Sequence, residues 1–299
     1  MTPRIDHYAD RAAWLEARRS GIGGSDVPVI LGYGRYGKTP LSVWTSKVLP
    51  PEEESESYTL KRGTFMEQFI AERLREEAGL RSVDRERDAV VTSEIDPCLR
   101  YSPDAFATDA DGNLALCEFK SRLRDAREWE EGIPPDVAAQ AQHGMDVCDL
   151  PACYVACDTG SELRWTRLER DPAWATDVRP RLIAWWHEYV VPQVPPPPQA
   201  EDAAVLARLY PREDAGRTIA LPGEFLALRD DLNEAEAIKS AAETKIDEIR
   251  NRVRAAMGDA ATGALADGSG WTWKVQKRKA YTVEAGESRV LRAYKSKEK

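Results

Sequence analysis

The sequence predicts an α/β domain with a mixed sheet, followed by a separate region built on one long helix. Three observations indicate this fold class: helical and strand periods alternate before residue 192, prolines crowd residues 192–199, and a charged helical period extends over residues 223–257. A chain of 299 residues is about twice the length of an ordinary domain. We therefore expect a first domain at residues 1–191, a linker at residues 192–199 and an appendage at residues 200–299.

Side-chain periodicity predicts the elements of the first domain. Residues 62–78 predict a helix because Met66, Ile70 and Leu74 share one face, and Gly79 follows as a helix terminator. The other expected elements are strands at residues 99–107 and 113–120 joined by a turn at Asp111-Gly112, a helix at residues 136–148, and strands at residues 152–158 and 162–168. This order predicts a mixed central sheet flanked by helices.

The region after residue 191 has a different pattern. Its proline run fits neither a helix nor a central strand, which indicates an extended linker. The long helix carries an apolar stripe that requires a partner helix or a domain surface. The alternation of Trp271, Trp273 and Val275 with polar residues predicts a short strand, with residues 281–283 as a candidate hairpin partner.

Composition narrows the function classes. No apolar stretch approaches the roughly 18 residues of a membrane span, and no charged-then-apolar leader follows Met1, so we expect a cytoplasmic protein without membrane contact. The five cysteines are odd in number and form no C-x-x-C pair, which argues against a disulfide framework or a zinc knuckle. Carboxylates are abundant, whereas histidines are only three.

Charge is distributed unevenly along the chain. The net charge is −9, but residues 271–299 hold nine Lys or Arg against three Glu, which leaves −15 on the remainder. A basic tail with aromatic residues is typical of a segment that grips DNA or docks a partner. A solvated charged tail is the alternative interpretation.

The chemistry is concentrated around two strands. Glu118 and Lys120 point to one face of a strand while Phe119 points to the other, and the preceding turn returns Asp104 beside them. Two converging carboxylates favour Mg²⁺, with Mn²⁺ as a substitute, and an adjacent ammonium polarises a water molecule. Two carboxylates with an adjacent ammonium are suited to phosphodiester hydrolysis. An ordinary ion pair at a solvated hairpin edge is the alternative interpretation.

Two further polar residues border apolar helix faces. Glu67 has no Lys or Arg three or four residues away, so it is a candidate third acid, with a distant arginine partner as the alternative. Gln140 lies beside the face formed by Val137 and Ala141, where its amide could orient a water or a phosphate. A hydrogen-bonded glutamine at the edge of the core explains the same position.

The segment at residues 21–26 is rich in glycine. Gly21, Gly23 and Gly24 permit close backbone approach, and Ser25 or Asp26 can cap a helix at residues 27–30. A helix start with Arg18 nearby is suited to phosphate binding. A plain turn is the alternative interpretation.

Together these residues resemble the YqaJ and lambda exonuclease family of phage recombination nucleases, a branch of the PD-(D/E)XK restriction-endonuclease-like fold. The motifs that carry the resemblance follow the family's order over about residues 10–190: R-x-x-G-I-G-G-S-D at Arg18–Asp26, T-P-L-x-V-W-x-x-K at Thr39–Lys47, R-G-x-x-x-E at Arg62–Glu67, S-P-D at Ser102–Asp104, E-F-K at Glu118–Lys120 and Q-x-Q-x-x-M at Gln140–Met145. The resemblance implies a PD-(D/E)XK core, to which the chain adds a long helix and a hairpin.

The resemblance also implies roles for individual residues. Asp104, Glu118 and the Phe119 carbonyl would ligate the metal, and Lys120 would activate water. Glu67 would support the metal or a second ion, and Gln140 would lie in the same site. The 5′-phosphate of a duplex end would be held by Arg18, Ser25 and Ser102. Two departures stand out: Val137 replaces a tyrosine found in many relatives, and the spacing from Asp104 to Glu118 is long.

These implications define the functional expectation. We expect a Mg²⁺-dependent 5′ to 3′ exonuclease that resects linear double-stranded DNA ends and passes the remaining strand to a single-strand annealing protein, in a bacterial cell and encoded by a phage or prophage. A homo-oligomer is implied, with a trimer as one candidate. The alternatives are an endonuclease or nickase using the same site, and a catalytically idle DNA-binding module. Activity should rise into mildly alkaline pH.

Overall fold

The computed structural model describes residues 5–51, 57–123 and 126–279, and it divides the chain into two compact units, Met1–Arg208 and Leu209–Lys299. The first unit therefore extends past the predicted linker. The reason is a buried contact: the Asp202 carboxylate, which is fully buried, accepts a hydrogen bond from the Thr39 hydroxyl and another from the Gln199 backbone N–H at 2.6 Å. The short helices η4 (Ala200–Asp202) and α7 (Ala203–Leu209) follow the prolines.

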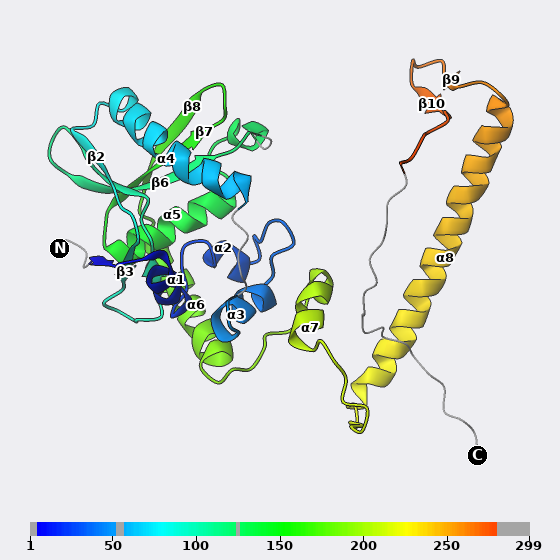
Figure 1. Cartoon of the computed structure of the whole chain (residues 1–299), viewed down its shortest axis with the longest axis horizontal. Helices are drawn as coiled ribbons and strands as arrows, with labels where there is room; N and C mark the ends of the chain where they lie inside the picture. Colours follow the sequence, from blue (N-terminus) through cyan, green and yellow to red (C-terminus); the bar gives the residue numbers. More distant parts are fainter. Residues whose placement is uncertain (1–4, 52–56, 124–125, 280–299) are drawn as a thin grey trace. The chain divides into compact units, whose positions relative to one another are not determined.

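Strands and helices alternate through the first unit (Figure 1). The N-terminal part contains β1 (Ile5–His7), α1 (Arg11–Arg19), α2 (Val27–Ile30), α3 (Pro40–Val48), α4 (Tyr58–Glu77), β2 (Ser82–Arg85), β3 (Ala89–Thr92) and β4 (Arg100–Tyr101). The C-terminal part contains β5 (Ala105–Thr108), β6 (Leu114–Ser121), η1 (Ala126–Trp129), α5 (Pro135–Cys148), β7 (Ala152–Asp158), β8 (Leu163–Glu169), η2 (Trp174–Val178), α6 (Arg179–Trp185) and η3 (Trp186–Val190).

The main sheet is mixed, as predicted. Its five strands follow the order β2-β5-β6-β7-β8, and only the β6–β7 pair is parallel. A parallel pair needs a crossover connection, and α5 supplies it. A second, three-stranded sheet has the order β1-β3-β4 and is antiparallel. The mixed α/β fold class is therefore confirmed.

Alternation along β6 determines what each face of the main sheet carries. Cys117 and Phe119 belong to the core that also contains Ile70 and Leu74 of α4. Leu116 points to the other face, where it lies against α5. Because side chains alternate along a strand, Glu118 and Lys120 share the α5 side with Leu116. Helices α4 and α5 thus cover opposite faces of the sheet (Figure 1).

Most predicted boundaries in this unit agree with the structure within a few residues, but the single strand predicted at residues 99–107 is wrong. The structure has β4 and β5 there, in two different sheets, because Pro103 between them has no N–H to donate to a strand ladder. Helix α4 begins four residues before the predicted start, and Gly79 adopts a left-handed φ of 64° just after it. The expected cap of α2 is wrong, because the Asp26 side chain makes no capping hydrogen bond to this helix. It points back to the Gly23 N–H at 2.8 Å and pairs with Lys47 at 2.6 Å.

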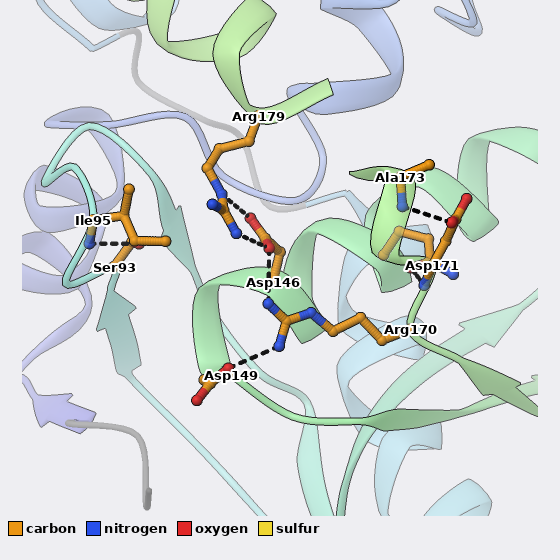
Figure 2. Close-up of polar contacts among 9 residues, drawn as sticks. Ser93, Ile95, Asp146, Asp149, Arg170, Asp171, Ala173 and Arg179 are labelled. Atoms are coloured by element: carbon orange, nitrogen blue, oxygen red, sulfur yellow. Dashed lines mark hydrogen bonds and ion pairs between the residues drawn. The ribbon is translucent and has the colours of Figure 1, made fainter. Parts of the chain in front are cut away.

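A buried ion cluster holds the C-terminal end of α5 (Figure 2). The Asp146 side chain, only 2% exposed, accepts hydrogen bonds from Arg170 just after β8 and from Arg179 at the start of α6. Arg170 also contacts the exposed Asp149 at 2.8 Å. Two guanidinium groups therefore compensate one buried carboxylate and tie three segments together.

The second unit contains α8 (Glu224–Met257), β9 (Thr262–Ala264) and β10 (Gly270–Thr272). The long helix confirms the predicted helical period over residues 223–257. Strand β10 pairs with β9, with Trp271 opposite Gly263. The candidate hairpin partner at residues 281–283 lies outside the described part of the chain. Between the two strands Asp267-Gly268 forms the turn, with a φ of 83° at Gly268. Across the described residues, no helix has the length and apolar character of a membrane span.

Candidate active site

A pocket of about 170 Å³ opens where the glycine loop after α1, the β4–β5 connection, β6 and α5 meet. It gathers seven of the residues predicted from the sequence: Arg18, Ser25, Ser102, Asp104, Glu118, Lys120 and Gln140. Residues separated by more than 120 positions in the chain thus line one cavity. Its other lining residues are Gly23, Gly24, Val90, Arg100 and Tyr101.

Asp104 and Glu118 form the acidic centre of the pocket. Asp104 sits just before β5, and its Oδ2 accepts the Phe119 backbone N–H at 2.7 Å. Burial, together with the nearby Glu118 carboxylate, raises the pKa of Asp104 from 3.8 to about 8. A bound cation would favour the ionised form of this buried, closely spaced pair of carboxyl groups. A metal-ligating role for the Phe119 carbonyl stays a prediction.

Lys120 lies directly beside this acidic pair. Its ammonium donates a hydrogen bond to Oε1 of Glu118. Burial disfavours the charged form of Lys120, but Glu118 and Asp104 outweigh burial and raise its pKa above 10.5. Lys120 is therefore a permanent cation in the pocket. It can orient a water molecule and stabilise negative charge, but it cannot accept a proton in this state.

The pocket is also lined by residues with buried polar atoms that have no partner among the described residues. Among the described residues, nothing forms a hydrogen bond with the buried Ser102 hydroxyl or with the buried Oε1 of Gln140. Arg18 stacks over Trp14, with 4.5 Å from its guanidinium carbon to the ring centroid, and Ser25 is exposed on the glycine loop. Buried polar atoms are normally satisfied, so the pocket is built for a polar ligand.

The glycine loop is held from behind by Asp26. Burial opposes ionisation of this carboxyl, but Lys47 and the Gly23 N–H outweigh it and keep the pKa of Asp26 below 3.8. Lys47 also donates to the Arg18 carbonyl at 3.4 Å. The lysine that ends the T-P-L-x-V-W-x-x-K motif therefore fixes the loop rather than contacting the pocket.

Glu67 is not among the pocket-lining residues. It projects from α4 and pairs with Arg85 of β2 at 2.5 Å. The arginine partner that the sequence left as an alternative is therefore present, although Glu67 remains close enough to raise the pKa of Asp104. A catalytic role for Glu67 stays a prediction.

Sequence reasoning missed Tyr101. This side chain is 2% exposed, lines the pocket, and donates its hydroxyl to Oε2 of Glu118. Its position immediately before the S-P-D motif was the available signal. A tyrosine at the end of a short buried strand is ordinarily a core residue, so the pattern alone did not single it out.

Known proteins are similar to the part of the chain that contains this pocket. Residues 13–152 match the model of the YqaJ-like viral recombinase domain. Over 272 residues the chain is 26% identical to YqaJ, an uncharacterised protein of Bacillus subtilis (strain 168), with 86% of this chain and 81% of that protein aligned. An alkaline exonuclease (LHK-Exo) from Laribacter hongkongensis has a similar structure, with a TM-score of 0.50, 18% identity, and coverage of 66% of this chain and 98% of that one.

The first two matches confirm the resemblance drawn from the motifs, and the third, at its low identity, shows a shared fold. Every residue that lines the pocket lies within the matched segment. Residues 13–152 of this chain are therefore similar to the YqaJ-like viral recombinase domain.

Proposed function

We propose that this protein is a Mg²⁺-dependent deoxyribonuclease with a PD-(D/E)XK catalytic core, and that it degrades one strand of linear double-stranded DNA in the 5′ to 3′ direction. The observation that carries the proposal is the pocket itself, which joins two carboxylates, an ammonium and two buried polar atoms that no described residue hydrogen-bonds. The match to the YqaJ-like viral recombinase domain supports a role in recombination, and the structural relative bears the name of an exonuclease.

The donor set fits a hard divalent cation. Asp104 and Glu118 offer carboxylate oxygens. Burial and the nearby Glu118 carboxylate raise the pKa of Asp104, and a bound cation would stabilise both groups in their ionised form. Within the described residues, no three His, Cys, Asp or Glu side chains gather around one point, so water and substrate must complete the shell. This is how Mg²⁺ is usually held at phosphoryl sites, and Mn²⁺ is the expected substitute.

The residues that line the pocket have separate roles in the proposed reaction. When bound, Mg²⁺ would supply Lewis-acid polarisation of the phosphodiester and a more acidic water. Lys120 orients the attacking water and stabilises the charge that builds on the scissile phosphate. Ser102, Arg18 and Ser25 hold the terminal 5′-phosphate, while Gln140 orients the water or a phosphate oxygen.

An exonuclease of this kind has defined partners. Its substrate is a duplex DNA end, and its product strand passes to a single-strand annealing protein in a bacterial cell. We include a homo-oligomer, with a trimer as one candidate, in the proposal.

The second unit is proposed as a DNA-gripping or partner-docking appendage, because Trp271 and Trp273 are exposed beside basic residues. Loss of residues 209–299 should then weaken duplex affinity or processivity, and unchanged values would refute the appendage role.

The experiment compares wild type, Lys120→Ala and the control Glu162→Gln, whose side chain is exposed at the β7–β8 turn. Each is incubated with Mg²⁺ and two DNAs: a linear duplex labelled at its 5′ or 3′ end, and a covalently closed circle. The proposal predicts release of the 5′ label from the linear duplex by wild type and the control, but not by Lys120→Ala.

Two other outcomes would overturn it. Cutting of the closed circle assigns an endonuclease or nickase to the same pocket. Binding of DNA without cleavage of either substrate assigns a DNA-binding module without catalysis.

A further inference from the structure

Tyr101 contacts the acidic centre from within the core. Its hydroxyl donates to Oε2 of Glu118, while Lys120 donates to Oε1 of the same carboxylate. Each oxygen of Glu118 is therefore fixed by one donor. A carboxylate has about four acceptor positions, so lone pairs remain for a cation or a water.

The ring of Tyr101 has room only because two neighbours are glycines. A Cβ atom at Gly24 in the glycine loop would lie 2.7 Å from Cε2 of Tyr101. A Cβ atom at Gly144 in α5 would lie 2.6 Å from its Cζ. Real Cβ atoms do not approach other atoms this closely, so an alanine at either position must displace the ring or the backbone.

A third neighbour ties the ring to the same loop. His143 of α5 packs edge-on against Tyr101, with 6.4 Å between ring centroids and 63° between ring planes. Its Nε2 lies 3.3 Å from the carbonyl of Ile22 and 3.1 Å from that of Arg100. The orientation of Tyr101 is thus set jointly by α5 and by the segment that presents Ser25 to the pocket.

We propose that Tyr101 is a positioning residue: it holds the Glu118 carboxylate in the orientation that binds the divalent cation, and it couples that orientation to the glycine loop. This inference rests on the proposed cation site at Asp104 and Glu118. Gly24 and Gly144 are required because they leave space for the ring. In this role Tyr101 acts through Glu118.

The geometry of the hydroxyl supports this role, because it is a buried donor that contacts Glu118 from within the core. Partners that orient a metal-binding carboxylate typically contribute a factor of about 10 to 100 to metal affinity or activity.

The test measures Mn²⁺ binding to the full chain without DNA, by the electron paramagnetic resonance signal of free Mn²⁺. Tyr101→Phe keeps the ring and removes the hydroxyl. Tyr154→Phe is the matched control, because Tyr154 is likewise buried but lies on β7, in the core under α4. Glu118→Gln tests the cation site itself. Melting temperatures of all variants are measured in parallel.

We expect Tyr101→Phe to weaken Mn²⁺ binding about tenfold or more, with Tyr154→Phe unchanged. Unchanged affinity in Tyr101→Phe, with binding lost in Glu118→Gln, would overturn the positioning role and leave the proposed function intact. Wild-type affinity in Glu118→Gln would overturn the cation site and, with it, the proposed function.

A double-mutant cycle tests the coupling to the glycine loop. Gly24→Ala should weaken Mn²⁺ binding in the wild-type background, because the added methyl group displaces the Tyr101 ring. In the Tyr101→Phe background, where there is no hydroxyl to displace, it should cause little further loss. Equal losses in both backgrounds would show that the loop acts on the cation independently of Tyr101, and would refute the coupling.

Discussion

Replacing Asp104 by asparagine should make the metal-free protein more stable while it destroys the proposed cation site. In the folded chain, burial and the Glu118 carboxylate hold the pKa of Asp104 at about 8, against 3.8 for an ordinary aspartate. A carboxyl with a raised pKa favours folding only while it is protonated. Its contribution is complete below pH 3.8 and is lost progressively as the pH rises to about 8.

The size of the effect follows from that difference. At about 1.4 kcal/mol for each pKa unit, ionising Asp104 costs the folded protein up to about 5 kcal/mol at pH 8 and roughly 2 kcal/mol at pH 5. Asparagine retains an acceptor for the Phe119 N–H but carries no charge. The Asp104→Asn variant should therefore gain at least about 2 kcal/mol over wild type at pH 8, and less than half of its gain should persist at pH 5.

The assay is urea unfolding of EDTA-treated protein at both pH values. Asp26→Asn is the matched control of opposite sign, because Asp26 is paired with Lys47 and its pKa is lowered, so this variant should be less stable at pH 8. Adding Mg²⁺ should stabilise wild type, by about 2.7 kcal/mol at one hundred times its dissociation constant, but not Asp104→Asn. Equal or lower stability of metal-free Asp104→Asn at pH 8, or a gain independent of pH, would refute the reasoning.

Three further predictions concern the scaffold. Burial lowers the pKa of His143 below 6.5, so acidification from pH 7.5 to 5.5 should lower the melting temperature of wild type more than that of His143→Gln; equal losses would contradict this. Asp146→Ala should cost about 3–5 kcal/mol in urea unfolding, because it leaves Arg179 without its carboxylate partner and Arg170 with only the exposed Asp149. Asp149→Ala, at an exposed position, should cost about 1 kcal/mol or less, and similar costs for the two variants would refute a buried cluster. A chain ending at residue 208 should keep the melting temperature of the first unit. A chain ending at residue 199 should melt about 5 °C lower, because the buried contact between Asp202 and Thr39 is lost. Equal melting temperatures of the two truncated chains would place the boundary at the prolines.

The sequence predicted features that depend on local geometry. Alternation along one strand was enough to place Glu118 and Lys120 on the same face, and helical period located α5. The order of motifs then identified most of the residues that meet in the pocket. Each of these inferences needs only the regular repeat of a strand or helix, or a resemblance carried by neighbouring residues.

Other features depend on which distant segments meet in space. Nothing in the sequence near Glu67 indicates that Arg85 is its partner. Glu67 lies on a helix and Arg85 on a strand, and the two meet only when that helix packs on the sheet. The contact of Tyr101 with Glu118 is hidden for the same reason. Strand β9, which pairs with β10, was not predicted, although the Asp267-Gly268 turn between the two strands is a local hairpin signal.

The most direct test of the account is the rate at which mononucleotides are released from a linear duplex by wild type and by Glu118→Gln, with Mg²⁺ and with EDTA, at mildly alkaline pH. The account predicts release by wild type only when Mg²⁺ is present, and a rate at least about a hundredfold lower for Glu118→Gln although the variant still folds and binds DNA. Release at the wild-type rate by Glu118→Gln, or release by wild type in EDTA, would contradict the assignment of this pocket as a metal-dependent nuclease site.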